Sequence, residues 1–326
     1  MDEADWLAAR FEEQRAHLRT VAYRMLGSLT EADDAVQNSW LRLSSAGTAD
    51  VENLAGWLTT VVARECLNML RARRRRREEP LGVYVPDPVI NRADGTNPED
   101  EALLADSVGL ALNVVLDTLA PAERLAFVLH DMFAVPFDEI APMVGRSPDA
   151  ARQLASRARR RVRGAAVHAP DPDIGRQREI VDAFFAAARR GDFDALVAAL
   201  DPDVVLRSDG GTAYPEVSVV LHGPAAVVNH GLRIHDPAAL LRPVLVNGAA
   251  GAVVILHGQP VAVVGFTVAR GKVAAIDIIA DPERLRRFDL ASLVGVLHEA
   301  RGGVVRVGDE GLDEEQYWHV HPPRNP

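Results

Sequence analysis

Apolar residues recur at helical spacing through the first part of the chain. Leu18, Val21 and Met25 follow one another at intervals of three or four residues, and residues 58–70 repeat the pattern. Such spacing places apolar side chains on one face of a helix, whereas a strand alternates at every second position. The pattern predicts an all-α bundle over residues 1–77.

Proline and acidic residues interrupt the helical pattern after this bundle. Residues 78–105 contain Pro80, Pro86, Pro88 and Pro98 among several carboxylates. Proline has no backbone N–H to donate within a helix or a sheet, so this composition is typical of a connecting segment. We therefore expect residues 78–105 to be a linker.

A second helical pattern follows the linker and contains a helix-turn-helix signature. Residues 137–144 predict one helix, and Gly145 suits a left-handed helix end. Ser147 and Pro148 then suit the cap and the first position of another helix. We expect an all-α domain over residues 106–168 with this signature near its centre.

The pattern changes to a mixture of helix and strand near residue 174. One amphipathic helix is followed by β-rich segments at 204–207, 217–221, 242–246, 252–256, 261–268 and 273–279. Short apolar runs between turn residues are typical of strands. They predict an α+β domain over residues 174–288. A helix over 289–300 and a largely disordered acidic end complete the expected C-terminal segment, residues 289–326.

The net charge argues at first against DNA binding, but the distribution of charge reverses that conclusion. The chain has a formal net charge of -10, and affinity for phosphates depends on Lys and Arg. Two basic blocks nevertheless stand out, residues 57–77 and 146–163, each with seven arginines against one acidic residue. Basic clusters of this kind indicate nucleic-acid binding.

Composition also excludes several classes of protein. The chain has no run of about 20 apolar residues that would cross a membrane, and its acidic start is unlike a secretory signal. Cys66 is the single cysteine, so one chain can form neither a disulfide framework nor a cysteine-based zinc site. We expect a cytoplasmic protein with no membrane partner.

The helix predicted to begin at Pro148 carries side chains that can read base edges. Arg and Gln pair with guanine and adenine in the major groove. The candidate reading residues on one face are Arg152, Gln153, Ser156 and Arg157. Residues 159–163 lie farther along the helix, where we expect their arginines to contact phosphates. The alternative is an exposed basic helix that binds nothing.

The first basic block also has two interpretations. Residues 73–77 suit the negative end of a helix dipole, and by themselves they fit a solvated helix end. The preceding helix favours DNA instead, because it adds stacking and polar groups. These groups are Trp57, Arg64, Asn68 and Arg71. Such a surface suits single-stranded or melted DNA.

Together these segments resemble a bacterial RNA polymerase sigma factor. EADDAVQNSWLRL at 31–43, followed by WLTTVVARECLNMLRARRRRR at 57–77, resembles sigma region 2. The segment at 119–162, which begins LAPAERLAFVLHDMF, resembles sigma region 4. Only a linker separates the two regions, an arrangement that resembles the extracytoplasmic-function (ECF) subfamily. VYVPDPV at 83–89 resembles the linker signature of its SigJ-like members, which carry a SnoaL-like C-terminal domain.

The resemblance implies a promoter-specificity factor and roles for individual residues. The part of region 2 that docks on core polymerase matches Asp33, Asp34, Gln37 and Trp40. The part that handles the minus-ten element matches Trp57, Arg64, Asn68, Arg71 and Arg74. The part of region 4 that reads the minus-thirty-five element matches Arg152, Gln153, Ser156, Arg157 and Arg160. The implied partners are core RNA polymerase, through its β′ and β subunits, and promoter DNA.

The resemblance also implies a regulatory third domain. The start of that domain, residues 178–211, looks like the helix and turn that open SnoaL-like and NTF2-like cones. SDGGTAYP at 208–215 and DPERL at 281–285 depart from the Asp-Gly-Gly-Gly-Lys and Asn-Pro-Asp-Lys-Leu patterns of the subgroup. We expect the domain to contact the linker and to act on transcription in cis. An unknown ligand of this domain is a further candidate partner. The linker residues implied are Tyr84, Pro86, Asp87 and Pro88.

Catalysis is the main alternative for this domain, since relatives of the fold include isomerases and cyclases. The candidate catalytic residues are Asp209, Tyr214, His222, His230, His257 and Asp277. None of their spacings indicates acid-base chemistry, and the histidines lack compact metal-ligand spacing. Because a fold alone does not confer activity, we expect no catalytic residue, cofactor or metal. A helix-turn-helix regulator that never joins polymerase is the other alternative, and it does not explain the acidic and aromatic helix around Trp40.

Overall fold

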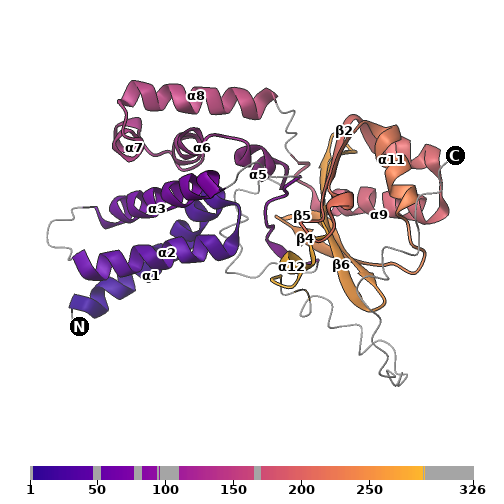
Figure 1. Ribbon diagram of the computed structural model, residues 1–326, viewed down its shortest axis with the longest axis horizontal. Helices are drawn as coiled ribbons and strands as arrows, with labels where there is room; N and C mark the ends of the chain where they lie inside the picture. Colours follow the sequence, from indigo (N-terminus) through magenta and orange to yellow (C-terminus); the bar gives the residue numbers. More distant parts are fainter. Residues whose placement is uncertain are drawn as a thin grey trace, which may run out of the picture. The chain divides into compact units, whose positions relative to one another are not determined.

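A computed structural model describes residues 3–46, 53–76, 83–93, 95, 110–164, 170–288 and 290. All of these residues belong to one compact unit, Met1–Leu293. Their elements form three N-terminal helices, a second helical group and a mixed domain of helices and strands (Figure 1). The predicted fold class, two all-α regions followed by an α+β domain, is confirmed.

The N-terminal bundle consists of three helices: α1 Glu3–Leu26, α2 Leu29–Ala46 and α3 Leu54–Arg76. Their inner faces bury the apolar residues predicted from the helical spacing, and Leu18 and Leu58 are both 0% exposed. The chain leaves α1 through Gly27, whose φ of +71° lies in the left-handed region. Glycine adopts this conformation without a Cβ clash, so α1 ends sharply there.

The second helical group contains α5 Leu110–Asp117, α6 Pro121–Phe127, the π-helical turn η1 Val128–Met132, α7 Phe137–Val144 and α8 Pro148–Gly164. α7 ends at Gly145, which has a φ of +66°. The hydroxyl of Ser147 then accepts a hydrogen bond of 3.3 Å from the backbone N–H of Ala150. The predicted helix stop and cap are confirmed, and α7 and α8 form the helix-turn-helix.

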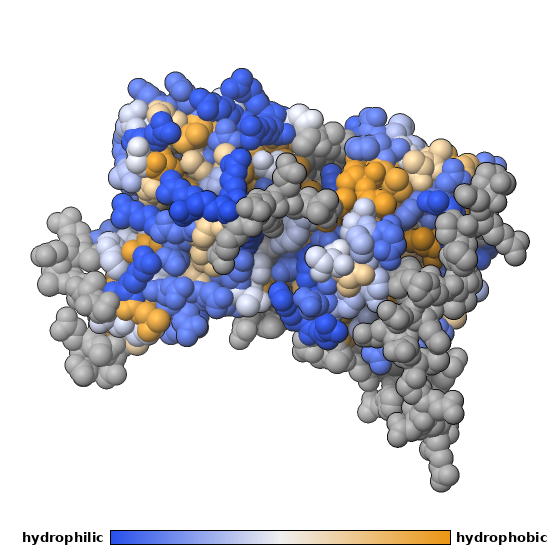
Figure 2. Space-filling view, in the orientation of Figure 1, coloured by the Kyte–Doolittle hydropathy of each residue, from blue (hydrophilic) through white to orange (hydrophobic). Residues whose placement is uncertain are grey.

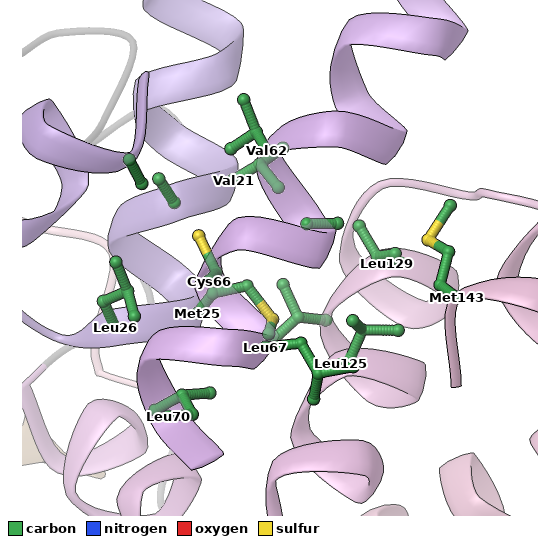
Figure 3. Close-up of a cluster of buried hydrophobic side chains, with 14 of the residues drawn as sticks. Val21, Met25, Leu26, Val62, Cys66, Leu67, Leu70, Leu125, Leu129 and Met143 are labelled. Carbon is green, nitrogen blue, oxygen red and sulfur yellow. The ribbon is translucent and has the colours of Figure 1, made fainter. Parts of the chain in front are cut away.

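One apolar core runs through both helical groups. Leu67 of α3 lies beside Leu125 of α6, and Leu129 and Met143 belong to the same cluster (Figure 3). Cys66 is buried in this core as well, with 0% exposure. Burial of apolar surface is the main favourable term in packing. Separation of the two groups would therefore expose apolar surface on α3 and α6.

The third domain is built from α9 Ile174–Arg190, α10 Phe193–Ala199, β2 Leu200–Asp209, η2 Pro215–Val217, β3 Val219–His222, α11 Pro224–Arg233, β4 Leu240–Val246, β5 Ala249–Leu256, β6 Gln259–Ala269, β7 Lys272–Ile279 and α12 Pro282–Leu285. All six predicted β segments overlap a strand. The described sheet has the order β1-β4-β5-β6-β7-β2-β3. β2 and β7 are parallel, and the other neighbours are antiparallel.

The first strand of this sheet comes from the predicted linker. β1, Ile90–Arg92, pairs antiparallel with the end of β4, and Ile90 lies opposite Val246. The segment predicted as a linker therefore also contributes a strand to the sheet, a feature that its composition did not predict. A strand of only three residues has no recognisable alternation, and its partner lies far away in the sequence.

Aromatic side chains fill the space between the sheet and the helices on one of its faces. Phe184 and Phe185 of α9 pack edge-on against Phe266 of β6, with ring centroids 5.9 and 5.3 Å apart. Val181 of α9 and Val227 of α11 join the same core. On the opposite face, a Cβ atom at Gly265 would lie 3.2 Å from Leu110 of α5. The sheet therefore packs between its own helices and the second helical group.

The remaining expectations concern residues at the edges of the described ranges. The predicted C-terminal segment, 289–326, lies outside the described residues apart from Leu290, as does the expected start of the second helical domain at residue 106. None of the described helices is long and apolar enough to cross a membrane.

Candidate nucleic-acid interface and linker clamp

The exposed face of α8 is the strongest candidate surface for duplex DNA. Ala151, Ala155 and Ala158 are 0% exposed and fix which side of the helix faces the core. The opposite side carries the predicted reading residues: Arg152, Gln153, Arg157 and Arg160 are exposed, and Ser156 is half-buried. The surface over α8, at the upper left of Figure 2, is largely hydrophilic. This arrangement suits a helix that enters a major groove.

Two of the arginines expected on phosphates are instead held within the helical group. Arg159 Nε donates to Asp131 of η1 at 2.7 Å, and Arg161 Nη1 donates to Glu123 of α6 at 2.7 Å. Both guanidiniums are thus paired with carboxylates in the absence of DNA, and their contact with phosphates stays a prediction for the DNA complex. Their acidic partners come from other helices, so spacing along α8 alone cannot reveal them.

A second basic stripe follows the outer face of α3. Arg64, Asn68 and Arg71 are exposed at intervals of four and three residues, which places them on one side of the helix. Trp57, about two helical turns before Arg64, is half-buried. Arg74, near the end of α3, is exposed. All five residues predicted to handle the minus-ten element thus reach the surface at least in part.

Arg73 differs from its neighbours in the basic run because it turns inward. Its side chain is 17% exposed and forms an ion pair with Glu31 at the start of α2. It also donates to the backbone carbonyl of Leu26 at 3.2 Å and lies 3.9 Å from Asp117 of α5. Arg73 therefore joins the N-terminal bundle to the second helical group, a role that the run of five arginines conceals.

Arg124 makes the deepest contact between the two helical groups. Its side chain is 2% exposed and forms an ion pair of 3.1 Å with Asp117. Its Nε donates to the backbone carbonyl of Arg24, in the last turn of α1, at 3.3 Å. Burial lowers the pKa of Arg124, and Asp117 partly opposes this effect. Carbonyls at a helix C-terminus lack intrahelical partners, so α1 offers a natural site for this guanidinium.

The residues predicted to dock on polymerase lie along α2. Asp33, Asp34 and Gln37 are exposed, but Asp33 accepts a hydrogen bond of 2.7 Å from Arg19 Nε. Trp40 is half-buried and packs on Phe11, with ring centroids 5.0 Å apart.

The structure adds Leu41 to this surface, because its side chain is 58% exposed. It follows Asp34 and Gln37 on the same helix face, at intervals of three and four residues. An exposed leucine among polar residues was the available sequence signal, but the helical pattern alone does not distinguish it from a core position.

The predicted regulatory linker is clamped to the third domain by Arg284 of α12. The guanidinium donates to Asp87 at 2.7 Å, to Asp209 at 2.6 Å and to the backbone carbonyl of Val85 at 2.5 Å. It also lies over the ring of Tyr84, 5.1 Å from the centroid. Burial acts to lower the pKa of Arg284, but Asp87, Tyr84 and Asp209 outweigh it and raise that pKa. Asp209 accepts a further hydrogen bond of 2.9 Å from Val85 N.

The other side of the linker contacts the N-terminal bundle. The backbone N–H of Asp87 donates to the carbonyl of Gly27 at 3.0 Å. Pro86 is buried against the same turn, where a Cβ at Gly27 would lie 3.2 Å from its own Cβ. Pro88 is buried too. Residues 84–89 of the linker are therefore enclosed between the bundle and the third domain.

A buried polar cluster joins the linker to all three folded parts. The Tyr23 hydroxyl of α1 lies 3.0 Å from the carbonyl of Asp87 and 3.1 Å from Asn247 Oδ1, in the β4–β5 turn. Asn247 Oδ1 also accepts a hydrogen bond of 2.7 Å from the backbone N–H of Val89. Asn113 of α5 donates a hydrogen bond of 3.3 Å to the Tyr23 hydroxyl. Burial raises the pKa of Tyr23 to about 12.

The two acidic candidates for catalysis in the third domain are both paired with arginines. Asp209 belongs to the linker clamp, and Asp277 pairs with Arg207 at 3.0 Å. His257 lies in the β5–β6 turn, whereas His222 is exposed on β3. Two hollows of about 550 and 150 Å³ in this domain are lined by none of the six candidates. Among the described residues, no group of three His, Cys, Asp or Glu side chains could hold a metal.

Two helical groups with exposed basic faces, joined by a linker, are the arrangement expected of a promoter-specificity factor. Residues 11–76 match the family model for Sigma-70 region 2, and residues 110–162 match the model for Sigma-70, region 4. The matched ranges include the segments at 31–43 and 119–162 that resemble these regions.

Whole-chain relatives extend this match through the third domain. The ECF RNA polymerase sigma factor SigJ of Mycobacterium tuberculosis is 39% identical over 289 residues, which cover 85% of this chain and 92% of SigJ. A probable ECF sigma factor SigI of the same species is 31% identical over 87% of this chain and 97% of its own length. The crystal structure of SigJ has a TM-score of 0.68 and 37% identity, covering 86% of this chain and 98% of that one.

The chain belongs to the ECF family of RNA polymerase sigma factors. Members of this family direct promoter-specific transcription initiation with core RNA polymerase and are not enzymes. The helices α1–α3 are accordingly called region 2 below, and α5–α8 region 4.

Proposed function

We propose that the third domain restrains this sigma factor in cis by holding regions 2 and 4 in an arrangement that cannot span a promoter. In this proposal α2 docks on core polymerase, α3 handles the minus-ten strand and α8 reads the minus-thirty-five duplex. The observation that carries it is the enclosure of the linker. Arg284 holds the linker on the third domain, while Gly27 and Tyr23 hold it on region 2.

The distance between α3 and α8 decides whether regions 2 and 4 can bind both promoter elements while they share a core. The two promoter elements lie about 25 base pairs apart, or ~85 Å along B-DNA at ~3.4 Å per base pair. α3 contacts α6 and α7 directly, and α8 packs on the same two helices. Packed helices lie about 8–10 Å apart, so α3 and α8 are separated by roughly 20 Å. Regions 2 and 4 must therefore part before both elements can be bound.

The third domain opposes this separation because it contacts both region 2 and region 4. Asn247 binds the Tyr23 hydroxyl of region 2 and the N–H of Val89 in the linker. Leu110 of region 4 lies against Gly265 of β6. Two tethered readers bind strongly only when both engage at once, so a restraint on their separation lowers promoter affinity. Core polymerase then favours the open state by binding it more tightly.

A distance measurement on the full chain tests this proposal. Labels on Glu12→Cys of region 2 and Arg163→Cys of region 4 report the separation, since both positions are exposed. Cys66 does not compete for label, because it is buried and burial raises the pKa of its thiol. We expect a short distance in the free factor and a longer one with core polymerase and promoter DNA. Equal distances in the two states would refute the proposal.

Transcription with purified core polymerase supplies the second test. Arg284→Met breaks the clamp, and we expect it to raise initiation at low factor concentration. Arg287→Met is the matched control, because Arg287 is exposed in the turn that follows α12. Unchanged initiation by Arg284→Met, with the control also unchanged, would mean that the clamp does not limit activity.

A further inference from the structure

Phe137, the first residue of α7, is held in a fixed orientation between η1 and α8. The ring of His130 stacks on it, with centroids 3.8 Å apart and an interplanar angle of 28°. His130 is itself oriented by its Nδ1, which lies 3.0 Å from the carbonyl oxygen of Val135. Phe137 also packs against the core shared by regions 2 and 4. The ring is thus a fixed feature at the base of the recognition helix.

Arg152 is attached to this ring and to one carboxylate of its own helix. Its Cζ lies 5.4 Å from the centroid of Phe137, within the range of a cation–π contact. Its Nη1 donates to Asp149 Oδ1 at 2.5 Å. The side chain nevertheless remains 59% exposed. The guanidinium of Arg152 is therefore held on one face and at Nη1, while much of the side chain stays exposed to a ligand.

Its neighbours on the reading face lack this support. Arg157 and Arg160 are exposed, and neither has a hydrogen bond or ion pair to another side chain within the described residues. A free arginine must lose rotamer freedom when it binds a base, whereas a guanidinium that is already oriented loses less. The difference singles out Arg152 among the candidate readers.

We propose that Phe137 is a positioning residue that orients Arg152 for recognition of a guanine, with Asp149 completing the hold. The inference rests on the proposed role of α8 in reading the minus-thirty-five element. Guanine presents its O6 and N7 acceptors to a guanidinium in a bidentate geometry, which requires a defined orientation of the plane. The Phe137 ring restricts that plane without occupying a donor, because a cation–π contact uses the face of the guanidinium.

Asp149 contributes differently, since it is an exposed carboxylate in the first turn of α8. It occupies one donor of Arg152 in the free protein and repels nearby phosphates. Its negative charge disfavours the approach of a phosphate, whereas the O6 and N7 acceptors of guanine carry no net charge. The carboxylate thus favours base recognition over non-specific contact.

The test uses the full-length factor in complex with core polymerase and a duplex library randomised over the minus-thirty-five element. The variants are Phe137→Leu, Arg152→Ala and the double variant, with binding measured at each base pair of the selected site. Loss of the ring contact should weaken binding about 2- to 5-fold, the range of an exposed cation–π contact. The loss should concentrate at the base pair that Arg152→Ala affects, and it should vanish in the Arg152→Ala background.

Controls separate positioning from a general effect on folding. Phe137→Tyr keeps the ring and should restore wild-type discrimination. Phe133→Leu removes a neighbouring aromatic whose ring packs on His17, and it should not alter base preference. Asp149→Asn lies on the surface and should raise affinity for unrelated duplexes while it lowers discrimination at the same base pair.

The outcomes distinguish this inference from the function on which it rests. If Arg152→Ala shifts no base preference, the assignment of Arg152 as a reader fails. If Arg152→Ala shifts preference but Phe137→Leu weakens binding equally at all base pairs, or adds fully to Arg152→Ala, then Phe137 has no positioning role. Retained discrimination in both Phe137→Leu and Asp149→Asn likewise overturns it.

Discussion

The hydroxyl of Tyr23 in region 2 and the side-chain oxygen of Asn247 in the third domain meet in a buried contact of 3.1 Å, although 224 positions separate them in the chain. Asn247 can reach this point because it lies in the β4–β5 turn with a φ of +51°. Asparagine tolerates this left-handed conformation better than most residues. A local backbone requirement and a contact between domains are thus met by the same side chain.

Removal of the Tyr23 hydroxyl should destabilise the closed factor. Tyr23→Phe keeps the ring in the core but leaves Asn113 Nδ2 without the acceptor that it has now. An unpaired buried polar group costs about 1–3 kcal/mol, so we expect the free energy of unfolding to fall by about that amount. Urea denaturation measures it. A change below about 0.5 kcal/mol would show that the cluster adds little beyond packing.

The pH dependence of stability should carry a signature of the same phenol. Burial raises the pKa of Tyr23 from 10.0 to about 12, so the folded protein keeps a proton that the unfolded chain loses. The free energy of unfolding should therefore fall as pH rises from about 10 to about 12. Tyr23→Phe should show a shallower fall when unfolding is measured across this range. Parallel curves for the two proteins would contradict the assignment.

The linker clamp should depend on the charge of Arg284. Arg284→Met leaves Asp87 and Asp209 without their shared cation, and removal of one partner from a buried ion pair costs about 3–5 kcal/mol. We expect a loss near the lower end of that range, because Val85 N still pairs with Asp209. Thermal unfolding of the variant beside Arg287→Met measures the difference. Equal midpoints for the two variants would show that the clamp does not stabilise the fold.

Two arginines of α8 provide a matched pair for DNA binding. Arg157 is exposed on the reading face, whereas Arg159 is bound to Asp131 within region 4. Arg157→Ala should lose about 1–3 kcal/mol of affinity, confined to one base pair if the contact is to a base. Arg159→Ala should have a smaller effect on binding and a larger one on the thermal stability of the protein. The reverse order would mean that the closed-state ion pair of Arg159 breaks when DNA binds.

Docking on polymerase should depend on Asp34 more cleanly than on Asp33. Asp33 is bound to Arg19, so its replacement also disturbs α1, whereas Asp34 is exposed on the same helix face as Leu41. We expect Asp34→Arg to weaken binding to core polymerase about tenfold, chiefly through slower association. Glu12→Arg, which makes the same charge change on α1, should bind as the wild type does. Surface plasmon resonance with immobilised core polymerase gives both rates.

Local chemistry explains what could be predicted from the sequence. Gly145, Ser147 and Pro148 act within a few residues of one another, so the turn of the helix-turn-helix is encoded where it forms. The orientations of Arg73, Arg159 and Arg161 depend instead on acidic groups from other helices. Their arginine neighbours look identical in sequence, and only packing decides which of them pair with carboxylates. The strand Ile90–Arg92 escaped prediction for the same reason, because its partner lies in β4.

Because β1 belongs to the sheet, the third domain keeps part of the linker from extending. Residues 83–92 run along region 2 and the sheet, held by Arg284, Asn247 and β4. Ten extended residues span ~33 Å. The chain between Arg76 and Leu110, fully drawn out at ~3.3 Å per residue, reaches ~110 Å and exceeds the ~85 Å between promoter elements. Detachment of β1 from the sheet would thus increase the distance that regions 2 and 4 can reach from each other.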